Sequence, residues 1–152
     1  MLRKVNCSVD ITPIVARLNA ISDAVKALKE LQRLTYDEFA VEHVLVGSAE
    51  RDFQVGIQAA LDIAAYLLAD SGVDVPSEYS EVFRALGRIG VVPVLFADKL
   101  VGMAKFRNVL VHLYLEVDLR KVYGYIQHDL DDFILYAKHI SDYLAQASAQ
   151  NG

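Results

Sequence analysis

The sequence predicts an all-α fold, an up-and-down bundle of four to five main helices. Apolar residues recur at three- and four-residue spacing through most of the chain, which is the period of an amphipathic helix. Helix-starting and helix-ending residues separate these segments, and hardly any stretch alternates apolar and polar residues as a half-buried strand does. Because 152 residues are enough to bury one core, we expect residues 1–152 to form a single domain whose core spans about 12–145.

Two helices are expected in the N-terminal third of the chain. Thr12 is a suitable N-cap and Pro13 fits the first helical position, so the first helix is expected over about 13–34. Thr35 and Glu38 have the spacing of a capping box, which predicts that the chain restarts as a helix there.

A long amphipathic helix is expected to begin at about Glu50. It should end near Gly72, because a glycine after the last helical turn is a natural C-cap. Gly47, shortly before this segment, either breaks a helix or lies within one, and the sequence leaves both possibilities open.

A short helix and then the fourth main helix follow a loop at 73–77. Ser77 or Ser80 can cap the short helix, and Gly90 is expected to end it. Pro93 should open the fourth main helix, because proline is favoured in the first helical turn.

The C-terminal part predicts one or two more helical turns and a last long helix. Asp118 can cap the turns that continue to Ile126, and Asp129 is expected to begin the last helix, whose apolar stripe runs to Leu144. The tail 145–152 is expected to fray.

Composition and charge restrict the classes of function. The formal net charge of −5 argues against a protein that simply coats nucleic acid, although an RNA-cleaving site needs only a local positive field. Hydrophobic residues make up 54% of the chain and the mean hydropathy is +0.27. This apolar surplus predicts burial beyond one monomer's core, and hence an oligomer.

Location is also constrained by composition. No uninterrupted apolar run approaches the ~20 residues of a membrane helix, so no membrane span is expected. Cys7 is the single cysteine, and a chain that cannot form an internal disulfide is typical of the reducing cytoplasm. We therefore expect a cytoplasmic protein.

One stretch of the fourth main helix carries most of the functional information. An arginine, an amide, an imidazole and a phenol fall within eight positions, at Arg107, Asn108, His112 and Tyr114. At about 100° per residue, the first three share one arc of a helix. Each of these residues alone has an ordinary structural role. Together they predict a partly enclosed site where they bind one anion, because burying an arginine without a partner costs free energy.

Apolar residues share the arc of these three polar residues. A polar trio within such a second apolar face predicts burial against another subunit. The apolar residues concerned are Leu100, Val101, Ala104, Val111 and Leu115.

The pattern Arg107-x4-His112-x-Tyr114, with Asn108 after the arginine, resembles the signature of HepT-type toxins of the HEPN superfamily. Segments around Glu50 to Ala64, Gly90 to Pro93 and Leu115 to Tyr123 are also similar to that family. The resemblance implies a metal-independent endoribonuclease that acts as the toxin of a toxin–antitoxin pair, with its active site at a two-fold homodimer interface.

The resemblance also implies roles for the four residues. His112 and its symmetry mate would supply the base and the acid of RNA cleavage, and Arg107 would hold the scissile phosphate. Asn108 would orient the phosphate or His112. A nucleotidyltransferase antitoxin would transfer AMP to Tyr114 and silence the toxin. No metal or other cofactor is expected.

A second interpretation belongs to another class of protein. The chain could be a non-catalytic dimeric partner of a minimal nucleotidyltransferase that holds a nucleotide in the same cleft. The joint presence of Arg107, His112 and Tyr114 favours the nuclease, because such a partner would not need all three.

Overall fold

The computed structural model describes residues 10–111 and 116–151, which contain helices and no strand. The all-α prediction is confirmed. The elements are α1 (Thr12–Glu30), the 3-10 helix η1 (Leu31–Arg33), α2 (Tyr36–Ala40), α3 (His43–Asp70), α4 (Tyr79–Arg88), α5 (Val94–Val111), α6 (Leu119–His128) and α7 (Leu130–Asn151).

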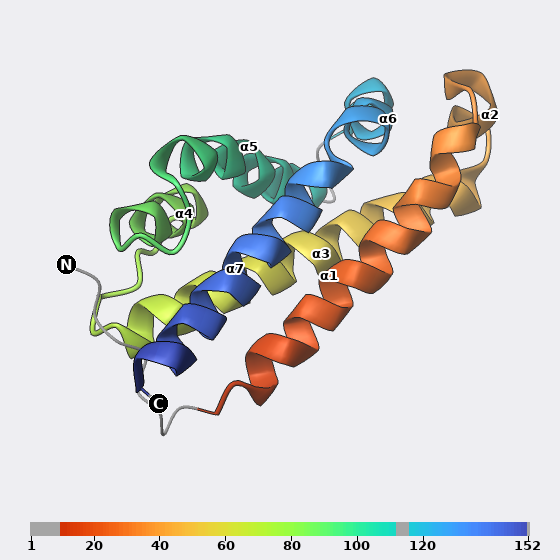
Figure 1. The fold of residues 1–152 in the computed structure, drawn as a ribbon. Coiled ribbons are helices and arrows are strands. Elements are labelled where there is room, and N and C mark those ends of the chain that lie inside the picture. Colours follow the sequence, from red (N-terminus) through yellow and green to blue (C-terminus); the bar gives the residue numbers. More distant parts are fainter. Residues whose placement is uncertain (1–9, 112–115, 152) are drawn as a thin grey trace.

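The longest helices form the body of the molecule. Helices α1, α3 and α7 run alongside one another, and α4 and α5 form a pair that packs against α3 (Figure 1). The short helices α2 and α6 lie together at one end of the bundle. Within the described part of the chain, no helix is long and apolar enough to cross a membrane.

Aromatic side chains fill the centre of the bundle. Phe53, Phe83 and Tyr136 are fully buried, and the ring of Tyr136 meets that of Phe83 edge-on at 6.0 Å. The Tyr136 hydroxyl donates a 2.7 Å hydrogen bond to the Ala60 carbonyl, which satisfies the one polar atom of this side chain. Burial raises the pKa of the Tyr136 phenol far above its usual value, so the group stays neutral.

Several helix ends form as the sequence predicts. Thr35 and Glu38 make a complete capping box at the start of α2. Gly72 and Gly90 follow α3 and α4 with φ of 76° and 82°, the left-handed conformation that glycine adopts freely after a helix. Asp118 caps α6 by accepting a 3.0 Å hydrogen bond from the amide of Arg120.

The starts of two helices differ from the prediction. Thr12 is the first residue of α1 rather than its cap, and its amide donates instead to the Asp10 carboxylate at 2.9 Å. Helix α3 begins at His43, well before Glu50, so Gly47 lies within the helix. A side chain at Gly47 would meet nothing within 4 Å, so this glycine imposes no break.

Two other helix ends differ from the prediction. Neither Ser77 nor Ser80 caps α4, because Glu78 occupies the N-cap position without a side-chain bond. Helix α7 begins at Leu130, one residue after Asp129, and is helical as far as Asn151, through residues where fraying was expected. The burial of Ala147 in the core explains why these last turns stay helical.

The second apolar arc of α5 was misinterpreted. Leu100, Val101 and Ala104 are buried within the chain itself, Val111 is half-buried, and Leu115 lies outside the described residues. The three buried side chains therefore give no indication of a second subunit. The homodimer stays a prediction.

Two glycines of the α4–α5 pair should respond oppositely to alanine. A Cβ at Gly87 would lie 2.8 Å from the Cβ of Ala97, so Gly87→Ala must push the helices apart and should cost about 1–3 kcal/mol. A Cβ at Gly102, in the middle of α5, would meet nothing within 4 Å, so Gly102→Ala should gain up to about 1 kcal/mol from helix propensity. Urea unfolding followed by circular dichroism measures both, and equal stability of the two variants would contradict this packing.

Candidate active site

The guanidinium of Arg107 is held by an uncharged side chain. Arg107 lies near the end of α5, and both its Nε and its Nη2 donate to the Oε1 of Gln58 on α3, at 3.2 and 3.0 Å. Two of its five N–H donors are used in this way, and the other three have no acceptor among the described residues. Because the acceptor is an amide, the contact orients Arg107 without cancelling its charge.

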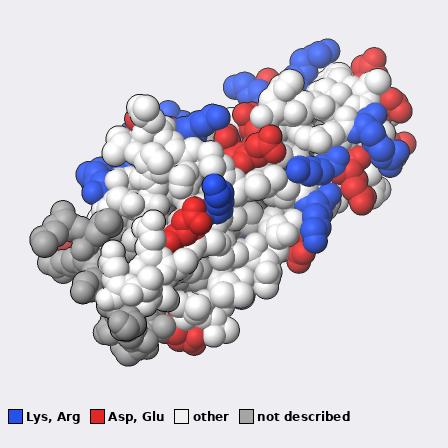
Figure 2. All heavy atoms as spheres, in the orientation of Figure 1, with Lys and Arg blue, Asp and Glu red and all other residues white. Residues whose placement is uncertain are grey.

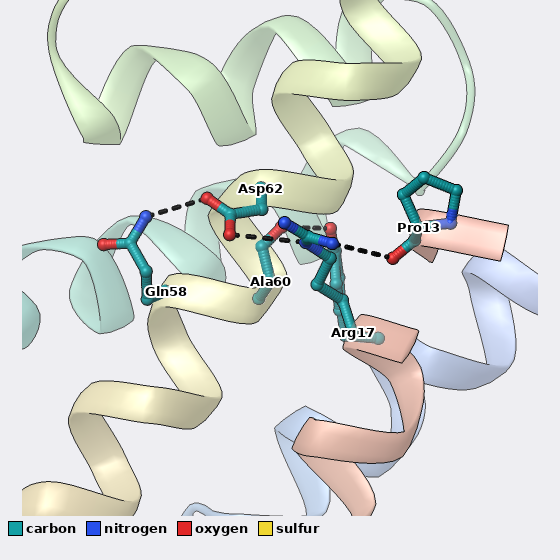
Figure 3. A network of polar contacts seen from close by, with 6 residues as sticks. Pro13, Arg17, Gln58, Ala60 and Asp62 are labelled. Atoms are coloured by element: carbon teal, nitrogen blue, oxygen red, sulfur yellow. Dashed lines mark hydrogen bonds and ion pairs between the residues drawn. The ribbon is translucent and has the colours of Figure 1, made fainter. Parts of the chain in front are cut away.

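A carboxylate fixes the orientation of that amide. Asp62, one helical turn after Gln58, accepts a 2.9 Å hydrogen bond from the Nε2 of Gln58 (Figure 3). An ionised carboxylate can only accept, so it holds the NH2 of Gln58 toward itself and leaves the carbonyl oxygen for Arg107. The other oxygen of Asp62 lies 3.5 Å from the Nε of Arg17 on α1. The Asp62 carboxylate thus has a positively charged partner in Arg17 as well as the amide of Gln58.

Tyr79 supports the other side of the site. Its ring lies under the guanidinium of Arg107, with the Cζ atom 4.7 Å from the ring centre, a cation–π distance. Tyr79 is the first residue of α4, so the tight pairing of α4 with α5 brings this ring to Arg107.

Arg107 lies at the edge of a groove of about 470 Å³ between α1 and α3. The groove contains three arginines and one aspartate, a local excess of positive charge in a chain of net charge −5. On the face shown in Figure 2, by contrast, basic and acidic side chains are intermingled, most of them toward the end where α2 lies. The lining residues are Ala16, Arg17, Ala20, Arg51, Gln54, Val55, Gln58, Ala59, Asp62 and Arg107.

Two carboxyl groups flank the groove arginine Arg51. Burial raises the pKa of Glu50. It also raises the pKa of Asp52, an effect that the positive charge of Arg51 partly offsets. Neither carboxylate lines the groove.

The predicted site residues do not all lie together in the structure. Asn108 is exposed and lines a separate hollow with Lys105 and residues 77–80, none of which lines the groove. His112 and Tyr114 lie outside the described residues. Among the described residues, no three His, Cys, Asp or Glu side chains gather as a metal site would require.

Gln58 and Tyr79 were missed as partners of Arg107 in the sequence. A signal for Gln58 was present, because polar residues at 51, 54, 58 and 62 recur at helical spacing and form one stripe of α3. Tyr79 gave no comparable signal, since its contact with Arg107 depends on how α4 packs against α5.

Comparison with known proteins shows which family this chain belongs to. The chain is 27% identical over 146 residues to the tRNA nuclease HepT of Aphanizomenon flos-aquae, covering 93% of this chain and 98% of that protein. It is 27% identical over 118 residues to the mRNA nuclease HepT of Shewanella oneidensis, covering 76% of this chain and 89% of that protein.

A solved structure shares the fold. It is a tri-AMPylated Shewanella oneidensis HEPN toxin in complex with MNT antitoxin, with a TM-score of 0.78 at 24% identity over 86% of this chain and 98% of that one. Residues 21–140 match the family described as Ribonuclease HepT-like. The chain therefore belongs to the HepT-like ribonuclease family.

Proposed function

We propose that this chain is a metal-independent endoribonuclease and the toxin of a toxin–antitoxin pair. The observation that carries the proposal is Arg107, which a neutral amide holds at the edge of an arginine-lined groove, five residues before His112. Support also comes from relatives that are named as tRNA and mRNA nucleases.

Arg107 would bind the scissile phosphate. A guanidinium is always charged, and its unused N–H donors match the oxygens of a phosphate. The negative charge on those oxygens grows in the transition state, so Arg107 stabilises the transition state more than the bound substrate. Asn108, exposed next to it, is proposed to orient the phosphate or His112.

His112 and the partner's His112 would divide the proton transfers in a homodimer. One imidazole removes the proton of the 2′-hydroxyl, whose oxygen attacks phosphorus. The bond from phosphorus to the 5′-oxygen breaks, and the second, protonated imidazole gives that oxygen its proton. The products are a 2′,3′-cyclic phosphate and a 5′-hydroxyl, with no net change in protons or electrons.

Tyr114 would be the point of control. We propose that a nucleotidyltransferase antitoxin transfers AMP to its hydroxyl, as the AMPylated solved relative in complex with MNT antitoxin supports. Each AMP adds bulk and negative charge two residues from His112, which repels and blocks an RNA phosphate.

Alanine at either proposed catalytic residue should stop RNA cleavage. Loss of the phosphate ligand in Arg107→Ala should lower kcat by about 10²–10³, and loss of the acid–base group in His112→Ala by about 10²–10⁴. The assay follows a fluorescent RNA with a chelator present and identifies the cyclic phosphate end. Arg84→Ala is the matched control, because Arg84 is engaged by Glu81 on α4. A variant that still cleaves at the wild-type rate would remove that residue from the mechanism, whereas a wild-type protein that cleaves no RNA would favour the non-catalytic partner instead.

Two substitutions of Gln58 test why an amide holds Arg107. Gln58→Met removes the acceptor and frees the guanidinium, whereas Gln58→Glu keeps an acceptor but neutralises the charge that a phosphate needs. We expect Gln58→Glu to lower kcat/KM by about 10–100-fold, because its ion pair with Arg107 would compete with the phosphate. A Gln58→Glu enzyme as active as the wild type would show that Gln58 only anchors the helices.

Tyr114→Phe should separate cleavage from its control. Without the phenol oxygen no AMP can be attached there, so the variant should stay active when antitoxin and ATP are added. Intact-mass spectrometry counts the AMP units, and Tyr66→Phe serves as the control because Tyr66 bonds elsewhere, to the Asp10 carbonyl. Full AMP transfer to Tyr114→Phe would rule out Tyr114 as the acceptor.

A further inference from the structure

The groove next to Arg107 extends well beyond the reach of one phosphate. Arg51 and Gln58 lie seven positions apart on the same face of α3, which is two helical turns or about 10 Å along the helix. Because Gln58 accepts the hydrogen bonds of Arg107, the guanidinium of Arg107 lies beside Gln58 on α3. Arg51 therefore lies at a part of the groove that the phosphate on Arg107 does not occupy.

The charges of the groove are arranged to attract an anion. Both oxygens of Asp62 are engaged, one by Arg17 and the other by Gln58, so its charge is locally balanced (Figure 3). Arg17 is also tied to the Pro13 carbonyl at 3.3 Å, which fixes it on the α1 side. Arg51 is exposed and makes no ion pair or hydrogen bond with any residue that the structure describes.

The residues that line the groove suit the sugar-phosphate backbone of RNA better than its bases. Its described lining includes the small side chains Ala16, Ala20 and Ala59, and no aromatic ring is among the lining residues that the structure describes. Proteins that bind the bases of a single strand commonly stack them on aromatic rings, and the described part of this groove offers none. Gln54 and Gln58 add amide donors suited to phosphate or ribose oxygens.

From this geometry we infer a second phosphate subsite, in which Arg51 holds a backbone phosphate of the same RNA strand that Arg107 is proposed to bind. The subsite rests on the proposed nuclease function and adds a substrate class to it: single-stranded RNA that extends at least one further phosphate beyond the scissile one. It also accounts for RNA binding by a chain that is acidic overall.

Substrate truncation tests the subsite. The substrates are a dinucleoside monophosphate, which has only the scissile phosphate, and a hexaribonucleotide with the same scissile step. Arg51→Gln should lower kcat/KM on the hexamer by about tenfold more than on the dinucleotide, the value of one charge-assisted hydrogen bond. Arg33→Gln, which changes an exposed arginine at the end of η1 that does not line the groove, is the matched control. Equal losses on both substrates, or none on the hexamer, would overturn the subsite.

Binding measurements keep this test separate from the nuclease proposal. The probe is a labelled hexamer with a 2′-deoxy scissile position, titrated by fluorescence anisotropy at several salt concentrations. Arg51→Gln should weaken binding and flatten the slope of log Kd against log salt by about 0.7, the loss of one phosphate contact on a single strand. If wild-type protein binds the probe in this way but cleaves no RNA, the nuclease proposal fails and the subsite stands.

Sedimentation velocity tests the alternative that the groove is a contact between protein chains. If the groove were a contact between protein chains, Arg51→Gln would change the association state. We expect wild type and variant to sediment alike, and a shift in mass together with an unchanged salt slope would assign the groove to a protein interface.

Discussion

The two hydrogen bonds from Arg107 to Gln58 are the contact on which the site depends. A carboxylate at this position would hold the arginine more tightly and remove its value to a phosphate, because the ion pair would be complete before substrate arrives. An amide gives orientation at little electrostatic cost. Asp62 orients this amide by accepting a hydrogen bond from it. Asp62 makes no contact with Arg107 among the described hydrogen bonds and instead pairs with Arg17. The result joins α1, α3 and α5 while the charge of Arg107 remains available.

The pairing of α4 with α5 provides the second constraint. Gly87 lets the two helices approach so closely that no Cβ fits between it and Ala97. At the other end of α4, Tyr79 then reaches the face of the Arg107 guanidinium. Tyr79 also lines the hollow that contains Asn108. Packing far from the chemistry thus determines which neighbours the motif residues have.

A groove lined by arginines makes an acidic chain compatible with the proposed RNA substrate. Charges on the exposed surface are screened over about 8–10 Å at physiological salt, so a phosphate entering the groove responds mainly to the nearby arginines. The net charge of −5 then favours short contacts with RNA over broad adhesion. Because shared folds host different activities, this argument rests on the groove and on Arg107 rather than on the helical bundle.

The sequence by itself determined the helical class, several helix boundaries and the family, because these depend on local periodicity, on capping residues and on a motif with fixed spacing. It misjudged what covers the arc of Leu100 and Ala104, since periodicity shows that a face is buried but not what buries it. Only the tertiary structure decided that Gln58, far away in the sequence, holds Arg107, and that Asn108 faces a different hollow. Contacts between distant segments depend on how helices cross, and no local pattern encodes that angle.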